Sequence, residues 1–229
     1  MHTTLATTAV PAPTDGIRFP AAPLARPARD TVTPAVGATR RLGKDEEVFG
    51  EGDRAAYFYK VVSGAVRTSK LLSDGRRQID AFHLAGDMFG IESGDEHRFS
   101  AEAVGDAAVV VYRRCALDTL AAQDGAFARE IVAAMMRALE RAQEHMLLLG
   151  RKSAIEKIAS FLLDMAERAC DNAIELPMSR IDIADHLGLT IETVSRSLTQ
   201  LERKGLIALP AQRRTIRLRH KAALENLRA

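Results

Sequence analysis

The sequence predicts an α+β fold with an N-terminal β jelly roll, a long helix and a C-terminal winged helix-turn-helix. Three observations lead to this prediction. Glycines recur at intervals of 12, 11 and 11 residues in the first half of the chain. Apolar residues then recur every three or four positions, and two short helical patterns separated by Gly188 follow near the end. Evenly spaced turns indicate short strands, whereas the longer period indicates helices.

The composition excludes several other classes of protein. A hydrophobic fraction of 47% over 229 residues can bury a core, which excludes a wholly disordered or collagen-like chain. No apolar run approaches the roughly 20 residues of a membrane span, and the first residues do not resemble a secretory signal. We therefore expect a cytoplasmic protein without membrane contact. Cys115 and Cys170 are the only cysteines, too few for a disulfide framework or a four-thiolate site.

Residues 1–39 are predicted to form a flexible N-terminal arm. They contain six of the eight prolines and show no hydrophobic period. Charge then separates along the chain: residues 40–149 have a net charge of −3 and residues 150–229 a net charge of +4. A basic C-terminal part favours a polyanionic partner such as DNA.

Residues 40–117 are predicted to form the β jelly roll, a sensor-like domain. Turns every 8 to 12 residues are typical of antiparallel strands in two packed layers. The turns lie at Gly52, Gly64, Gly75 and Gly86. The strands expected between and after them are Tyr57–Val62, Ala65–Leu72, Gln78–Leu84 and Ala101–Tyr112.

Residues 118–149 are predicted to form a dimerisation helix, continuous from Phe127 to Leu149. An apolar seam runs beside charged residues, and so narrow a seam favours a partner helix over burial within the chain. We therefore expect a homodimer. The predicted seam consists of Ile131, Met135, Leu139, Ala142, Met146 and Leu149.

Residues 150–229 are predicted to form a winged helix-turn-helix DNA-binding domain, beginning with an amphipathic segment, Ala154–Cys170. Ser179 can cap a helix over Arg180–Leu187, with Asp182 returning the bond, and Gly188 ends that helix. Thr190 can cap the second helix, Ile191–Lys204, which leaves polar residues exposed for a ligand. Two strands, Leu206–Leu209 and Thr215–Leu218, flank a basic wing.

The segment Ile183–Leu198 resembles the helix-turn-helix of Crp/Fnr transcription factors, and its Glu-x-x-Ser-Arg form is similar to the Fnr and FixK branch. The resemblance extends over about residues 40–220. It includes turns similar to those of a cyclic-nucleotide-binding-type jelly roll at Val48–Asp53, Val62–Gly64 and Gly86–Gly90, and the segment Leu149–Ala159.

Glu192, Ser195 and Arg196 are the predicted base-reading residues. In the major groove a guanidinium can bind guanine O6 and N7 and a carboxylate can accept from cytosine N4, so Arg196 and Glu192 can read neighbouring pairs. The resemblance implies a TTGAT half-site, with Arg196 on guanine, Glu192 on the opposite cytosine and Ser195 on a thymine. Residues expected to contact the DNA backbone are Arg180, Thr190, Thr193, Arg213 and Arg214.

No bound cofactor is expected. The Arg-Ser pair of cAMP-binding relatives is interrupted at Arg98-Phe-Ser, and residues 1–114 lack the cysteines of oxygen-sensing relatives with an iron-sulfur cluster. His83, His97 and His145 form no pattern that identifies haem, and each is expected to be solvated or structural. Both cysteines are expected to be inert thiols rather than sensors.

The sequence therefore predicts a homodimeric transcription factor, not an enzyme, that binds double-stranded DNA. The resemblance implies an activator that contacts RNA polymerase and controls genes for low-oxygen respiration or nitrogen fixation, with oxygen sensed upstream by another protein. Three alternatives remain open. The first is a cyclic-nucleotide-responsive regulator, in which Arg98 is a displaced phosphate ligand. The second is a cupin-like metal-dependent enzyme fused to a helix-turn-helix, and the third is a barrel used as a protein-docking module alongside DNA binding. The second lacks the expected His-x-His pattern.

Overall fold

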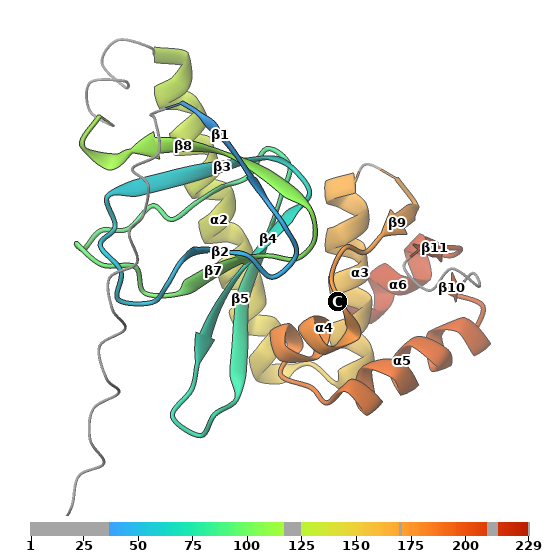
Figure 1. Cartoon of the computed structure of the whole chain (residues 1–229). Coiled ribbons are helices and arrows are strands. Elements are labelled where there is room, and N and C mark those ends of the chain that lie inside the picture. Colours follow the sequence, from blue (N-terminus) through green and yellow to red (C-terminus); the bar gives the residue numbers. More distant parts are fainter. Residues whose placement is uncertain (1–36, 117–124, 170, 210–214, 229) are drawn as a thin grey trace, which may run out of the picture. The chain divides into compact units, whose positions relative to one another are not determined.

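A computed structural model describes residues 37–116, 125–169, 171–209 and 215–228 (Figure 1). The predicted arm, except its last residues, Cys170 and the tip of the predicted wing lie outside these ranges. Within the described residues, no helix is long and apolar enough to cross a membrane.

The first half of the described chain forms two antiparallel four-stranded sheets, with strand orders β1-β8-β3-β6 and β2-β7-β4-β5. Their inward residues include Val61, Val66 and Val109, which are almost fully buried. The predicted two-layer β domain is therefore confirmed. Its strands are β1 (Thr39–Leu42), β2 (Glu47–Phe49), β3 (Tyr57–Ser63), β4 (Ala65–Leu71), β5 (Arg77–Leu84), β6 (Met88–Phe89), β7 (Ser100–Ala103) and β8 (Ala107–Arg113).

The prediction of one continuous strand over Ala101–Tyr112 is wrong. The chain forms β7 and β8, which lie in different sheets. At the break, the backbone N–H of Val104 donates to Ala65 O at 2.9 Å, and Gly105 follows in a bend before β8 begins. One apolar run of the sequence thus contributes a strand to each of the two sheets. The alternation of apolar and polar residues does not by itself show where such a run is divided.

Gly64, between β3 and β4, shows why the turns use glycine. Its φ of +76° lies in the left-handed region, and a Cβ there would be 2.3 Å from Asp106 O. No other residue fits at this position without moving the backbone of the neighbouring turn. The predicted turn at Gly64 is confirmed.

The predicted long helix is continuous and slightly longer than expected, α2 (Gly125–Arg151). One side attaches to the β domain, where Ile131 and Ala134 pack on Met88 and Lys60 pairs with Glu130. The other side exposes six large apolar residues. These are Val132, Met135, Met136, Leu139, Met146 and Leu147, each more than half exposed.

Two residues of the predicted seam are therefore misplaced. Ile131 is only 5% exposed and belongs to the contact with the β domain. Leu149 is half-buried against the core of the C-terminal half. At 3.6 residues per turn, these two residues are about five full turns apart and so lie at one edge of the seam, the edge that contacts the rest of the chain. The exposed stripe, which we call the α2 stripe, consists of Val132, Met135, Leu139, Ala142 and Met146.

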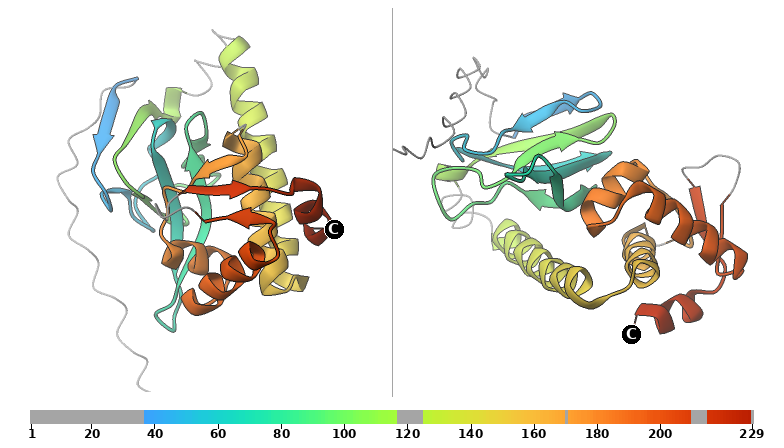
Figure 2. Two further views of the ribbon diagram at one scale, coloured as in Figure 1. Left: turned by 90° about the vertical axis from the view of Figure 1, so that its right-hand side faces the viewer. Right: turned by 90° about the horizontal axis from the view of Figure 1, so that it is seen from below.

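The C-terminal half contains helices around a small antiparallel sheet of order β10-β11-β9 (Figure 2). Ile158, Leu162, Leu187 and Leu201 are almost fully buried in its core. The predicted helices and wing strands are confirmed within about two residues, whereas α6, packed on α3, was not predicted. The elements are α3 (Ala154–Ala169), β9 (Ala173–Glu175), α4 (Arg180–Leu187), α5 (Ile191–Arg203), β10 (Ile207–Ala208), β11 (Thr215–Leu218) and α6 (Lys221–Arg228).

Candidate nucleic-acid interface

Helix α4 begins and ends at the predicted caps. Ser179 Oγ accepts from the backbone N–H of Asp182 at 3.1 Å, and Asp182 Oδ2 accepts from the N–H of Ser179 at 3.0 Å. This reciprocal capping box satisfies two N–H groups that the helix leaves free. At the other end, Gly188 has a φ of +61° and its N–H donates to Ala184 O. The two helices α4 and α5 are therefore joined by a short, defined turn.

Helix α5 is held by one face, leaving the other exposed. Thr190 Oγ1 accepts from the N–H of Thr193 at 3.3 Å and caps its first turn. Val194, Leu198 and Leu201, at spacings of four and three, are buried in the core. This packing fixes the rotation of α5 about its axis and determines which side chains face outward.

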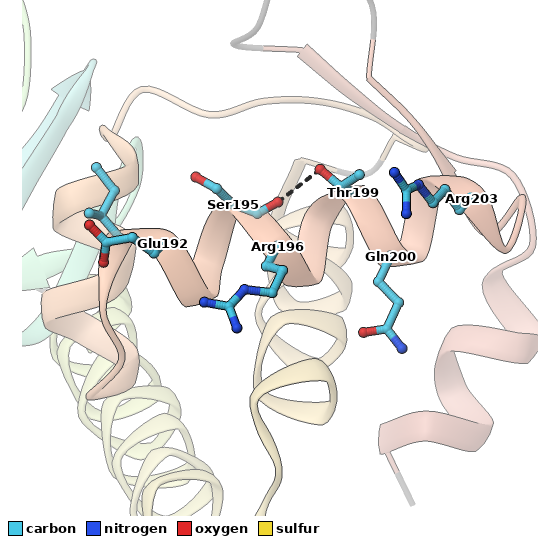
Figure 3. A pocket seen from close by; sticks show the side chains of 7 residues that line it. Glu192, Ser195, Arg196, Thr199, Gln200 and Arg203 are labelled. Atoms are coloured by element: carbon cyan, nitrogen blue, oxygen red, sulfur yellow. Dashed lines mark hydrogen bonds between the residues drawn. The ribbon is translucent and has the colours of Figure 1, made fainter.

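The exposed face of α5 lines a shallow open hollow (Figure 3). It brings together Glu192, Ser195 and Arg196, the three predicted base-reading residues, on one side of the helix. The exposed face extends further along α5 than the three predicted residues. Its residues further along the helix follow the predicted ones at intervals of four positions, a spacing that can be recognised in the sequence. Four further residues line the hollow: Ile191, Thr199, Gln200 and Arg203.

The charges on this face are suited to hydrogen bonding with base edges. The pKa of Glu192 is lowered most by a hydrogen bond from its own backbone N–H. A hydrogen bond from Thr190 and the charge of Arg196 lower it further. At neutral pH Glu192 is therefore an ionised acceptor. Within the described residues, no hydrogen bond or ion pair occupies the guanidinium of Arg196. An ionised acceptor at Glu192 and a guanidinium donor at Arg196, one turn apart, match the donor and acceptor pattern of the major groove.

The residues predicted to contact the DNA backbone divide into three groups. Arg180 Nη1 donates to Ser195 Oγ at 3.1 Å and so connects α4 to α5. Thr190 and Thr193 lie within 3.1 Å through their hydroxyls, in the cap of α5. Arg213 and Arg214 lie outside the described residues. Contact of these five residues with phosphate stays a prediction.

The β domain has an interior filled with rings. Phe49 stacks on Tyr59, Phe89 and His97, and its ring centre lies 3.6 Å from that of His97. Burial raises the pKa of Tyr59 to about 12. Arg98, considered as a phosphate ligand, instead has a side chain 74% exposed and donates to Glu92 at 3.0 Å.

The three histidines considered for haem each bury a ring nitrogen. Nδ1 of His83, Nδ1 of His97 and Nε2 of His145 are buried, and burial lowers the pKa of each ring. No group of metal-ligating side chains occurs among the residues that the structure describes. Cys115 is exposed, and Cys170 lies outside the described ranges.

Comparison with known proteins finds relatives over most of the chain. Residues 39–124 match the cyclic nucleotide-binding domain family, and residues 156–227 match the Crp-like helix-turn-helix domain family. The chain is 50% identical over 209 residues to the nitrogen fixation regulation protein FixK of Azorhizobium caulinodans, covering 89% of this chain and 83% of that protein. It is 44% identical to FixK of Rhizobium meliloti over 195 residues, 85% of this chain and 88% of that protein.

A solved structure supports the same relationship. The structure of FixK2 from Bradyrhizobium japonicum has a TM-score of 0.79 and 50% identity, covering 85% of this chain and 98% of that one. The order of a β domain, a long helix and a helix-turn-helix is thus shared with a protein of closely similar sequence.

Proposed function

The chain belongs to the Crp/Fnr family of DNA-binding transcription regulators, is FixK-like and is not an enzyme, and we propose that it is a homodimeric activator that binds a TTGAT-type palindrome. The observation that carries this proposal is the exposed face of α5. There Glu192 and Arg196 lie one turn apart on the exposed side of the helix, beside Ser195. In the proposed complex Arg196 binds guanine, Glu192 the opposite cytosine and Ser195 a thymine.

The α2 stripe supports a dimer. Met135, Leu139 and Met146 are 51%, 53% and 66% exposed, respectively, in the single chain. Apolar residues repeated at spacings of three and four along a helix are covered by a second helix in coiled coils. A dimer with twofold symmetry places two copies of α5 on half-sites about one helical turn, ~34 Å, apart. A palindromic operator follows from that symmetry.

The names of the relatives support a proposal about which genes this chain controls. Proteins 44% to 50% identical to this chain are described as nitrogen fixation regulation proteins. We therefore propose that this chain controls genes for nitrogen fixation or low-oxygen respiration, with oxygen sensed upstream and RNA polymerase contacted at the promoter. The position of Arg98 on the surface, bonded to Glu92, supports DNA binding that needs no cyclic nucleotide.

Selection of bound sequences from random DNA tests the recognition proposal. The full-length protein is expected to select two inverted TTGAT-type half-sites at one fixed spacing, equally with and without air or cAMP. Selection of a different half-site overturns the base assignments. A site that appears only with cAMP overturns effector independence.

The dimer is tested by charging the α2 stripe. Met135→Glu plus Met146→Glu is expected to give a monomer by sedimentation at micromolar concentration, because two carboxylates per chain enter an apolar interface. Ala133→Glu plus Arg137→Ala changes the net charge equally but on another side of α2, and is expected to remain a dimer. If the first variant also remains a dimer, association does not use the α2 stripe.

A further inference from the structure

Strand β5 of the β domain holds helix α4 through a pair of ion pairs. Arg77 Nη2 donates to Asp182 Oδ1 at 2.7 Å, and Arg77 Nε donates to Asp185 Oδ2 at 2.8 Å. One guanidinium thus binds two carboxylates that lie three residues apart on the same face of α4. Arginine is suited to this role because its donors form a rigid planar fork.

A second arginine, Arg67, takes part in this contact between the β domain and α4, and its ion pair with Asp182 is buried. Arg67, on β4, donates to the same Asp182 oxygen at 3.3 Å, and the side chains of both residues are only 7% exposed. Arg67 also binds Glu102 at 2.7 Å and Asp45 at 2.9 Å. Charges so poorly solvated are retained only when each has partners.

The contact extends along the whole of α4. Gln78 donates to the carbonyl oxygen of His186 at 3.2 Å, and His186 Nδ1 lies 3.1 Å from Ile79 O. Asp182, Asp185 and His186 occupy one face of the helix, while Ile183 and Leu187 are buried in the core shared with α5. Helix α4 is therefore held by β5 on one side and by α5 on the other.

We propose that Arg77 and Arg67 are positioning residues for DNA recognition. The proposal rests on the proposed dimeric, palindrome-binding function. In a dimer joined through α2, the distance and tilt between the two α5 helices depend on how α4 is held by the β domain. Arg77 and Arg67 then set the half-site spacing that the protein accepts, although neither lies on the base-reading face of α5.

The test compares two neighbouring arginines on the β4–β5 hairpin. Arg77→Glu places a carboxylate against Asp182 and Asp185. The control is Arg76→Glu, whose arginine is 78% exposed and pairs with Asp74 outside this contact. Both variants change the charge of the protomer by the same amount. Binding is measured on operators whose spacer between half-sites varies in steps of one base pair, and thermal unfolding verifies the fold.

Arg77→Glu is expected to weaken binding to the preferred spacing by roughly 3- to 30-fold and to flatten the dependence on spacer length. Arg76→Glu is expected to retain the preference. Adding Asp185→Arg to Arg77→Glu is expected to recover much of it, because the pair is re-formed with reversed charges. Arg77→Gln, which keeps a donor without the charge, serves as the milder variant if Arg77→Glu unfolds.

Two results overturn the proposal. In one, Arg77→Glu keeps the spacing preference of the wild type. In the other, Arg76→Glu flattens the preference equally, so that the effect reflects net charge alone. Both differ from failure of the proposed function, in which the wild-type protein itself shows no preferred palindrome.

Discussion

Helices α4 and α5 are neighbours joined by a short turn, and each has an acidic residue in its first turn. On α4, burial alone would raise the pKa of Asp182, but two hydrogen bonds from Ser179 and the charges of Arg67 and Arg77 outweigh burial and lower it. On α5, Glu192 is fully exposed, and its pKa is lowered by local hydrogen bonds. The same chemistry therefore serves architecture where charges are buried and paired, and is available for the proposed recognition of DNA where they are exposed.

The largest effect is expected on the buried side. Arg67→Met leaves Asp182, Glu102 and Asp45 without a common cation, and breaking such a buried pair costs about 3–5 kcal/mol of unfolding free energy. Urea denaturation measures the loss. Arg76→Met, on the exposed hairpin, is the control and is expected to leave the unfolding midpoint unchanged. A wild-type midpoint for Arg67→Met would mean that the buried network does not stabilise the fold.

On the exposed side, loss of an arginine is expected to change specificity and leave stability unchanged. A bidentate contact with guanine contributes about 1–3 kcal/mol of discrimination, so Arg196→Ala should lose about that much on the preferred operator and little on random DNA. Competition binding at fixed salt gives both affinities. Equal weakening on the two DNAs would identify Arg196 as a backbone contact.

The unfolding free energy is also expected to depend on pH, through His186 on the buried side of α4. Burial lowers the pKa of His186 most, the neighbouring His145 lowers it further, and the pKa falls to about 3. Below pH 6.5, the ordinary pKa of histidine, the unfolded chain therefore binds a proton at this residue that the folded protein does not bind. The contribution of His186 to stability is full above pH 6.5 and falls as the pH drops toward its folded pKa, by about 2 kcal/mol at pH 5.

Comparison with His186→Phe isolates this contribution from other titrating groups. The variant removes the titrating ring and keeps an aromatic side chain beside Phe82 and Phe161. Unfolding free energies of both proteins are measured from pH 7.5 to 5, where the variant is expected to lose less stability than the wild type. Parallel curves would show that His186 does not contribute to the acid sensitivity.

The smallest effect is expected where the two helices meet. Arg180 has only donors, so Ser195 Oγ accepts in their hydrogen bond and can direct its own proton toward a base. Arg180→Met and Ser195→Ala are expected to be non-additive on the preferred operator, with a coupling of about 0.5–1.5 kcal/mol in a double-mutant cycle. Additive losses, the same on all DNAs, would instead identify Arg180 as a phosphate contact.

The sequence by itself determined the features encoded by residues a few positions apart. The caps Ser179 and Thr190, the turn at Gly188 and the outward face of α5 follow from side chains that interact within one or two helical turns. The glycine turns of the β domain are likewise local, because a positive φ is a property of one residue. These signals were sufficient for the order of the β domain, the long helix and the helix-turn-helix, and for the exposed face of α5 on which the proposed base-reading residues lie.

Only the tertiary structure decided which apolar and charged residues meet across the chain. It divided one predicted strand between two sheets, turned Ile131 toward the β domain and paired Arg77 with Asp185, 108 residues away. An ion pair between distant residues leaves no periodic pattern, because either partner is compatible with an ordinary solvated surface. The physical reason is that burial, which distinguishes a paired charge from a free one, exists only after the chain has folded.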